Sequence, residues 1–275
     1  MKARTSFFQR LPWRRETGRQ SSPQGKAASP EGMRIYGIGD VHGCLKLLRS
    51  LEQQIADDCL ANPVRRPVIV VLGDLVDRGP DSRGVIEYLM AAQPAGIERR
   101  VLRGNHEQMA LDVFESPEQV FGWRQLGGAE TLHSYGVDPN SFLSAGGPVR
   151  LVDAWSKALP EAHRSWIEKL ETMLVIGDYC LVHAGIRPGV ALERQNSFDL
   201  LWIRDEFLDH TGDFGKVVVH GHTPVKEPDV RPNRINVDTG AYLTNCLTCV
   251  VLEGSSIRFL SATPSAGNIE RQSGT

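Results

Sequence analysis

The sequence predicts a layered α/β fold in which helices follow the first strands and the late strands add a second sheet. Three observations lead to this prediction. Short apolar runs alternate with amphipathic stretches early in the chain, residues 44–60 have helical periodicity, and several apolar runs follow one another near the end. A chain of 275 residues can bury one large core. We therefore expect one catalytic domain between two tails.

The predicted strands are short apolar runs that end in a glycine or a turn. They are RIYGIG (34–39), PVIVVLG (67–73), RRVLRG (99–104), YCLVHAG (179–185), KVVVHG (216–221), RINVDTG (234–240), LTCVVLEG (247–254) and SIRFLS (256–261). Residues 44–60 are predicted to form a helix, because Leu48, Leu51, Ile55 and Cys59 recur at helical spacing on one apolar face.

The rest of the chain divides by composition. Residues 1–32 are rich in Arg, Ser, Pro and Gly, and they contain too few apolar side chains to offset the entropy of ordering, which predicts a disordered basic arm. Residues 33–262 are the predicted catalytic domain, and 107–170 within it are predicted to form a helical cap over the site. Residues 263–275 resemble the arm in composition and are predicted to be a flexible tail.

Composition restricts the partners and the compartment. The net charge of -2 and the pI near 6.5 give no reason to expect nucleic acid or an anionic membrane surface as the partner. Five cysteines do not form a disulfide framework, so we expect a reducing cytoplasm. No apolar run approaches the ~18 residues that a membrane span needs, and we find no export signal.

Metal-binding side chains follow five of the predicted strands. Ligands in open sheets gather outside the carboxyl ends of the strands, so these side chains are expected to converge on one point. They are Asp40 and His42 in GDVHG, Asp74 in GDLVDRG, Asn105 and His106 in GNHE, His183 in VHAG, and His222 in GHTP.

The ligand types indicate which ions such a point would hold. Carboxylate, amide oxygen and imidazole without thiolate suit Mn²⁺, Fe or Zn²⁺ better than Ca²⁺. There are too many ligands for one ion, whereas a shared carboxylate can bridge two ions ~3.5–4 Å apart and trap a hydroxide between them. We therefore predict a dimetal hydrolase.

Charge identifies the substrate class. Two divalent ions carry four positive charges, Asp40 and Asp74 return two negative ones, and the other proposed ligands are neutral. The site keeps an excess of about two positive charges, which suits a phosphate dianion. Arg78, directly after Asp77 in GDLVDRG, can add a planar fork for phosphate oxygens.

These motifs occur in order over residues 39–224, and LWIRDE (201–206) and INVDTGA (235–241) extend the match. On these residues the chain resembles the phosphoprotein phosphatase family of calcineurin-like metallophosphoesterases, in particular its small bacterial and phage members. The resemblance implies a central two-sheet β-sandwich flanked by helices. It implies one metal held by Asp40, His42 and Asp74, and a second held by Asp74, Asn105, His183 and His222. It also implies that Arg78 and Arg204 bind the phosphate, and that His106, oriented by Asp77, protonates the leaving oxygen.

The resemblance further implies the reaction and the substrate. We expect a serine/threonine protein phosphatase that uses two ions, Mn²⁺ first among them, and a bridging hydroxide that attacks phosphoserine or phosphothreonine directly. The alternative within the family is a symmetrical dinucleoside tetraphosphate hydrolase. Such hydrolases that resemble this chain tend to have alanine at the position of Asp77, and their leaving group is already a stabilised anion. The aspartate therefore favours substrates whose poor alkoxide leaving group needs a proton.

Several assignments stay open at the level of sequence. His220 and His222 lie two apart in VVVHGH, and spacing cannot choose between them, although GHTP matches His222. Arg204 could be part of a structural ion pair, and Trp123 could line a groove or pack inside the cap. We read the remaining histidines as surface or core residues; they are His133, His163 and His210.

Two other function classes fit the sequence less well. Cys59 and Arg65 have the C-x5-R spacing of cysteine-dependent phosphatases, but the loop between them has no glycine and Pro63 has no N–H for a phosphate. A non-catalytic binding protein with this fold would be expected to have lost ligands, and none is missing. A metal-dependent enzyme is the reading that uses every motif.

Overall fold

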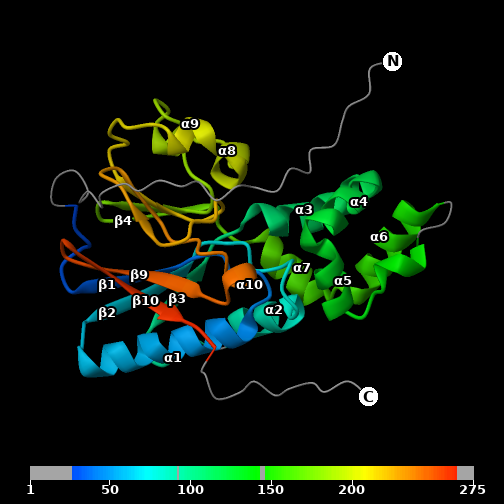
Figure 1. Ribbon diagram of the computed structural model, residues 1–275, viewed down its shortest axis with the longest axis horizontal. Coiled ribbons are helices and arrows are strands. Elements are labelled where there is room, and N and C mark those ends of the chain that lie inside the picture. The colour runs from blue at the N-terminus through cyan, green and yellow to red at the C-terminus, as the bar shows by residue number, and fades with distance from the viewer. Residues whose placement is uncertain (1–26, 92, 143–145, 265–275) are drawn as a thin grey trace.

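The computed structural model describes residues 27–91, 93–142 and 146–264, and these form two five-stranded sheets with helices around them (Figure 1). Residues 1–26 and 265–275, which make up most of the predicted arm and tail, lie outside the described residues. Residues 27–32, the last part of the predicted arm, contact the sheets. The Ser29 backbone N–H donates to the Gly254 carbonyl, and the Tyr179 hydroxyl donates to the Ala27 carbonyl.

The first sheet has the strand order β10-β9-β1-β2-β3. Its strands are β1 (Met33–Ile38), β2 (Arg66–Val71), β3 (Glu98–Val101), β9 (Leu247–Glu253) and β10 (Ser256–Ala262). β1, β2 and β3 are parallel, while β9 and β10 are antiparallel additions at one edge. The carboxyl ends of β1 to β3 therefore lie at the same end of the sheet.

The second sheet has the order β4-β5-β6-β8-β7. Its strands are β4 (Met173–Ile176), β5 (Tyr179–Val182), β6 (Val217–His220), β7 (Asp229–Val230) and β8 (Arg234–Asn236). β5, β6 and β8 are parallel, and β4 and β7 pair antiparallel at the two edges. All eight predicted strands are confirmed. β4 and β7 were not predicted.

Alternation along the strands explains how the sheets stack. In β1, Ile35 packs between the two sheets, whereas Tyr36 and Ile38 face the helices on the other side. Every residue of β1 is buried, as expected for a strand covered on both faces. The apolar layer between the sheets makes the structure a sandwich, and the predicted fold class is confirmed.

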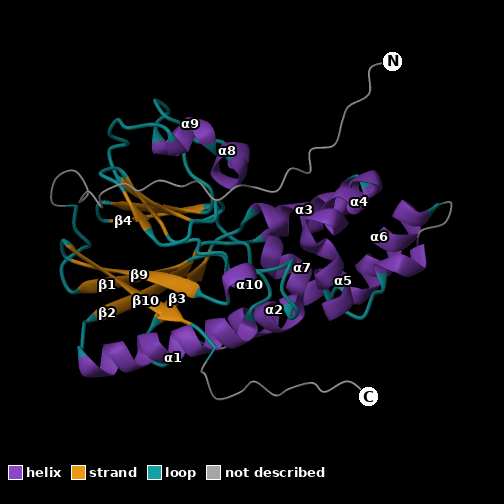
Figure 2. Ribbon diagram, viewed as in Figure 1, coloured by secondary structure: helices purple, strands orange, loops and turns teal. Residues whose placement is uncertain are grey.

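Helices cover the outer faces of both sheets (Figure 2). On the first sheet these are α1 (Leu45–Ala61) and α2 (Ser82–Met90), and on the second α8 (Ser197–Trp202) and α9 (Asp205–Leu208). α1 matches the predicted helix within one residue at each end. The short α10 (Ala241–Thr244) lies between β8 and β9 in the chain. Among the described helices, none combines the length and apolar composition needed to cross a bilayer.

The remaining helices gather beside the sandwich in a helical cap, as Figures 1 and 2 show. They are α3 (Asn105–Glu115), α4 (Val120–Trp123), α5 (Ala129–Ser134), α6 (Gly147–Ala158) and α7 (Glu161–Glu168). α3 to α6 share a hydrophobic cluster that includes Trp123, Tyr135 and Trp155. A wide turn, Arg124–Gly128, joins α4 to α5. This cap follows the third strand directly and so lies next to the carboxyl ends of the strands.

Candidate metal centre

The structure brings the predicted ligands together at the carboxyl ends of five strands. Each ligand lies within four residues of the end of β1, β2, β3, β5 or β6. All six are buried, with at most 5% of the residue surface exposed; they are Asp40, His42, Asp74, Asn105, His183 and His222. Glycines allow the loops to approach these carboxylates closely. A Cβ on Gly104 would lie 2.2 Å from Asp74 Oδ1, and one on Gly221 would lie 2.0 Å from Asp40 Oδ1, so a larger residue would not fit at either position with the carboxylate in place.

Backbone strain concentrates at this site. Non-glycine residues rarely adopt positive φ, and such residues often mark functional sites where the surrounding structure holds them. Among the described residues, six non-glycine positions have positive φ, and all but Asn245 belong to the predicted site. They are His42 (43°), Asp74 (47°), Asp77 (72°), Arg78 (68°) and His222 (65°).

The first ligand group consists of His42 and Asp74, with His106 in reach of the same point. The carboxylate of Asp40 accepts from the His222 backbone N–H and lies 3.9 Å from His183 Nδ1. His42 Nδ1 lies 2.8 Å from the Val76 carbonyl oxygen, so this nitrogen carries the proton and donates it. Its Nε2 is then an unprotonated acceptor, buried without a hydrogen-bond partner, and 3.4 Å from Asp74 Oδ2. Two acceptors that face each other need a cation between them. This geometry fits a metal ion.

The second group shows the same arrangement around His183. Its Nδ1 lies 3.0 Å from the Leu72 carbonyl oxygen, so its Nε2 is the acceptor. That Nε2 lies 2.9 Å from Asn105 Oδ1, 3.3 Å from Asp74 Oδ1 and 3.2 Å from His222 Nδ1. Asp74 directs one carboxylate oxygen to each group and is shared by the two clusters of candidate ligands. It occupies the place that a bridging carboxylate requires.

Electrostatics support a positive ligand here. Burial alone would raise the pKa of Asp74, yet the surrounding imidazoles, first His183, hold it well below its usual range. Burial raises the pKa of Asp40, and Asp238 and Asp74 raise it further. Asp238 is itself buried, and its pKa is raised to about 6, mainly by burial. Three buried carboxylates, Asp40, Asp74 and Asp238, thus lie close enough to affect one another's pKa.

Asp238 is a site residue that the sequence analysis did not assign. It follows β8, at the carboxyl end of the sheet like the ligands, within the quoted motif INVDTGA. Its Oδ1 accepts from the Gly240 backbone N–H at 2.9 Å. The signal that could have found it is its position, because RINVDTG was predicted as a strand that ends in aspartate and glycine.

His106 and Asp77, which were predicted to act together as proton donor and orienting carboxylate, are in contact and buried. His106 Nδ1 lies 2.6 Å from Asp77 Oδ2, and its Nε2 lies 3.0 Å from the Arg78 guanidinium. Burial lowers the pKa of His106, but Asp74 and Asp77 outweigh it, and the net shift is upward. His106 also lies within reach of the first ligand group, with Nε2 3.9 Å from Asp74 Oδ2. The imidazole therefore faces the metal cluster with one nitrogen and Asp77 with the other.

Both predicted phosphate-binding arginines lie near the cluster, because their charges reach its ligands. Burial raises the pKa of Asp40 and the charge of Arg78 lowers it, while burial and the charge of Arg204 both lower the pKa of His183. The Arg78 guanidinium lies 4.8 Å above the Tyr242 ring, and its backbone N–H donates to the Gly127 carbonyl at 3.1 Å. Arg204 is half-buried, and burial followed by the charge of Arg78 lowers its pKa. Within the part of the chain that the structure describes, no carboxylate pairs with Arg204, so the structural ion pair considered above is absent there.

The other histidines lie apart from the cluster. His220 packs its ring against Phe207 with centroids 4.9 Å apart, and its Nδ1 contacts the Gly221 carbonyl at 3.1 Å. His163 pairs with the Tyr135 hydroxyl at 2.9 Å inside the cap, and His210 packs on Phe214. His133 is exposed. His222 rather than His220 reaches His183 and Asn105.

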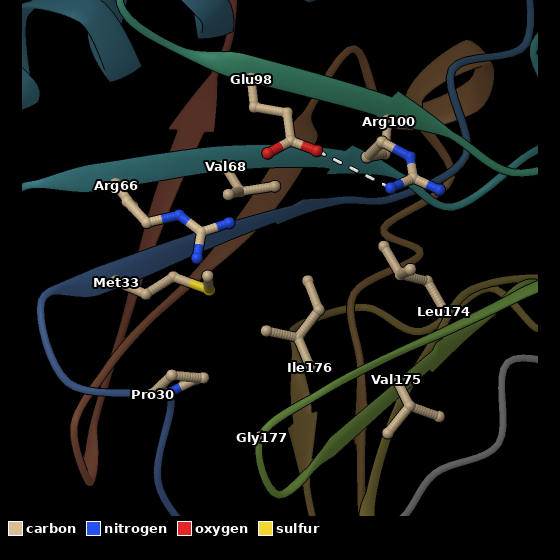
Figure 3. Close-up of a pocket in the computed structure, with 10 residues that line it drawn as sticks. All are labelled: Pro30, Met33, Arg66, Val68, Glu98, Arg100, Leu174, Val175, Ile176 and Gly177. Carbon is tan, nitrogen blue, oxygen red and sulfur yellow. Dashed lines mark ion pairs between the residues drawn. The ribbon is translucent and has the colours of Figure 1, made fainter.

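A pocket of about 300 Å³ lies at the opposite end of the strands (Figure 3). Its lining includes Met33, Arg66 and Glu98, the first residues of β1, β2 and β3. Arg100, also in the lining, forms an ion pair with Glu98 at 3.7 Å and another with Glu171. None of the predicted site residues lines this pocket, so the pocket is separate from the candidate metal ligands.

Comparison with known proteins agrees with this geometry. The family model for calcineurin-like phosphoesterases matches residues 33–247. The chain is 29% identical over 221 residues to serine/threonine-protein phosphatase 1 of Salmonella typhimurium, covering 78% of this chain and 89% of the relative. It is 31% identical over 235 residues to the asymmetrical bis(5'-nucleosyl)-tetraphosphatase PrpE of Bacillus subtilis, covering 77% and 87%.

Solved structures show the same fold. An inferred diadenosine tetraphosphatase aligns with a TM-score of 0.57 at 20% identity, covering 84% of this chain and 95% of that one. The cold-active protein-tyrosine phosphatase of a psychrophilic Shewanella species aligns with a TM-score of 0.53 at 16% identity, covering 86% and 84%. With the two-sheet sandwich, the cluster of candidate ligands and the family match, the chain belongs to the calcineurin-like phosphoesterases, metal-dependent hydrolases with a dimetal centre.

Proposed function

We propose that the protein is a serine/threonine protein phosphatase that transfers the phosphoryl group of phosphoserine or phosphothreonine directly to water. The observation that supports this most is the contact of 2.6 Å between His106 Nδ1 and Asp77 Oδ2, buried beside the ligand cluster. A held proton donor contributes typically 10²–10⁴-fold when the leaving group is a poor alkoxide, and far less when it is good. The Salmonella relative named above is consistent with such a substrate.

The residues would divide the work as follows. Asp40, His42 and Asp74 would hold one ion, and Asp74, Asn105, His183 and His222 the other; we propose Mn²⁺. When bound, the ions supply an activated water and positive charge for the phosphate. Arg78 and Arg204 would bind the phosphate oxygens. His106 donates its proton to the leaving oxygen, and Asp77 orients the imidazole. We propose the cytoplasm as the compartment.

The test is a direct comparison of substrates. We expect kcat/KM for phosphoserine and phosphothreonine peptides, assayed with Mn²⁺, to exceed that for diadenosine tetraphosphate. His106→Asn and Asp77→Asn should damage phosphoserine hydrolysis far more than hydrolysis of p-nitrophenyl phosphate, whose leaving group is good. A dinucleotide preferred by orders of magnitude, or equal losses on both leaving groups, would contradict the proposal.

A second candidate function is dinucleoside tetraphosphate hydrolysis, and one observation favours it. Phe198 is 70% exposed and stacks on Trp202 with centroids 6.3 Å apart, and the Trp202 ring lies 6.5 Å from that of His222. An exposed aromatic face beside the cluster can stack a nucleobase, typically for ~1–3 kcal/mol per base. Phe198→Ala should then lower kcat/KM for diadenosine tetraphosphate but not for p-nitrophenyl phosphate. Leu60→Ala, at an exposed apolar position on α1, is the matched control.

A further inference from the structure

The carboxylate of Asp77 is held by more than His106. The Trp123 indole donates from Nε1 to Oδ2 at 2.8 Å, and the Thr131 hydroxyl donates to Oδ1 at 2.5 Å. The Asp77 backbone N–H donates to Thr131 Oγ1 at 2.9 Å and to Ser82 Oγ at 3.0 Å. All four residues are buried, at 2% exposure or less. Both oxygens of the carboxylate therefore have fixed donors besides the imidazole.

Two of these donors come from the cap rather than from the loop that carries Asp77. Trp123 ends α4 and Thr131 belongs to α5. A carboxylate bound only to one imidazole could rotate about its last side-chain bond. The indole and the hydroxyl, acting on different oxygens, fix its plane and so fix the direction in which Oδ2 accepts from His106. The positive φ of Asp77 adds a strained backbone that needs such support.

The turn between α4 and α5 is shaped for this contact. A Cβ on Gly128 would lie 2.6 Å from the Trp123 ring, and one on Gly127, with φ 117°, would lie 2.6 Å from Arg78 Cγ. On its other side the Trp123 ring packs against Trp155, with centroids 5.5 Å apart. The two glycines thus let the turn lie directly on the indole and on Arg78, and the ring is held between Gly128 and Trp155.

We propose that Trp123 and Thr131 are positioning residues of the proton donor: the cap sets the Asp77 carboxylate, and through it the His106 imidazole. This rests on the proposed function, because it takes His106 to protonate the leaving oxygen. It gives Trp123 a role beyond the two weighed from the sequence, since its indole N–H acts on the reaction through Asp77. The cap is then part of the catalytic geometry as well as a wall beside it.

The test compares substitutions that remove a hydrogen bond but keep most of the volume. We expect Trp123→Phe, which removes one buried hydrogen bond, to lower kcat for phenyl phosphate about tenfold, because phenolate is a poorer leaving group than p-nitrophenolate. Thr131→Val removes both the hydroxyl that donates to Oδ1 and the acceptor of the Asp77 backbone N–H, so its effect should be at least as large. Turnover of p-nitrophenyl phosphate should change by less than about threefold, since a good leaving group depends little on the proton. Thr131→Ser keeps the hydroxyl and should retain near wild-type rates on both substrates.

Trp155→Phe is the matched control. This tryptophan lies in the same apolar cluster, but its indole donates to the Ala110 carbonyl at 3.1 Å and does not contact Asp77. It should alter thermal stability about as much as Trp123→Phe without changing the ratio of rates on the two substrates. Equal changes of that ratio in both tryptophan variants would overturn the proposal, because packing alone would then explain the effect.

A double-substitution cycle separates this proposal from the function on which it rests. In a His106→Asn background, Trp123→Phe and Thr131→Val should have no further effect on phenyl phosphate, because the group that they position is gone. An undiminished effect there, or no effect of either in the wild-type background, would overturn the positioning role alone. If His106→Asn itself slowed both substrates equally, the acid assignment would fail, and the positioning role with it. Should Trp123→Phe not fold, the Thr131 pair decides.

Discussion

Two regions of the molecule bury charged side chains, and they solve the problem in opposite ways. Under α1 and α2, Arg99 and Glu52 form an ion pair of 3.1 Å with side chains only 2% exposed. Arg99 also donates to the carbonyls of Leu89 and Ala91 at 3.0 Å, and the Tyr88 hydroxyl donates to Glu52 at 2.7 Å. Here both terminal nitrogens of the guanidinium meet acceptors within the chain.

In the cluster of candidate metal ligands, hydrogen-bond acceptors face other acceptors. His42 Nε2 is buried without a hydrogen-bond partner, and His183 Nε2 faces the oxygens of Asn105 and Asp74 and the Nδ1 of His222. The ion pair is complete when the chain folds, whereas the cluster is completed by a cation that the chain does not supply. The difference teaches that buried acceptors gathered to face one another mark a functional site, whereas a buried charge with its partner in place does not.

Among the predictions that test this contrast, removal of metal should cause the largest loss of activity. Because the cluster depends on a cation, exhaustive dialysis against EDTA should abolish hydrolysis of p-nitrophenyl phosphate, and Mn²⁺ should restore it best. Far-UV circular dichroism should change little, since the sheets and the Arg99–Glu52 pair do not depend on the ion. When Mn²⁺ is added back at a free concentration of about 100 times its Kd, the free energy of unfolding should rise by about 2.7 kcal/mol. Full activity in metal-free buffer would contradict this.

Asp74→Asn should remove the shared ligand of the cluster. Asp74 directs one oxygen to each candidate ligand group, so its loss should reduce bound metal from two ions to one or none, as measured by elemental analysis of the purified protein. Asp77→Asn is the control, because Asp77 lies three residues on and accepts from His106, Trp123 and Thr131 instead. Two ions retained by the Asp74 variant would remove that residue from a bridging role.

Disrupting the buried ion pair between Arg99 and Glu52 should lower the stability of the protein and leave its activity unchanged. Glu52→Gln leaves the Arg99 guanidinium buried without its counter-charge, and breaking such a pair typically costs about 3–5 kcal/mol of unfolding free energy. Urea unfolding would measure the loss, while kcat per folded molecule should stay at the wild-type value. Replacing both partners by apolar residues, Glu52→Leu with Arg99→Met, should recover much of the loss. Weaker metal binding in the Glu52 variant would show that the two regions are coupled.

Much of the site was predictable because the motifs follow strands. A short apolar run that ends in glycine and aspartate specifies both the strand and the place where its side chain emerges, and parallel strands bring such places together. β4 was missed because most of it is only partly buried, and β7 because it has two residues. Neither gives the alternation by which strands are found in a sequence.

Two features of the site depend on geometry that no local pattern carries. His220 and His222 could not be separated by strand alternation, and the structure shows why: β6 ends at His220, and His222 turns back with φ 65° towards Asp40, whose carboxylate accepts its backbone N–H. The contact between Trp123 and Asp77 joins residues 46 apart. It exists only once the cap has packed beside the sandwich, so the sequence left the role of Trp123 open.

Cys59→Ser should give the smallest effect, and it tests whether the cluster is needed at all. A cysteine-dependent mechanism would make the missing cation irrelevant, since the thiolate would attack the phosphate itself. Cys59 lies on α1 with its sulfur 3.3 Å from the Tyr36 hydroxyl, and Arg65 of the same C-x5-R spacing is exposed. We expect turnover of p-nitrophenyl phosphate to stay within a few fold of wild type, while Asp74→Asn in parallel loses most of it. A phosphocysteine trapped by rapid acid quench and found by mass spectrometry would instead assign the chemistry to the thiol, and the contrast between the two buried regions would then say nothing about catalysis.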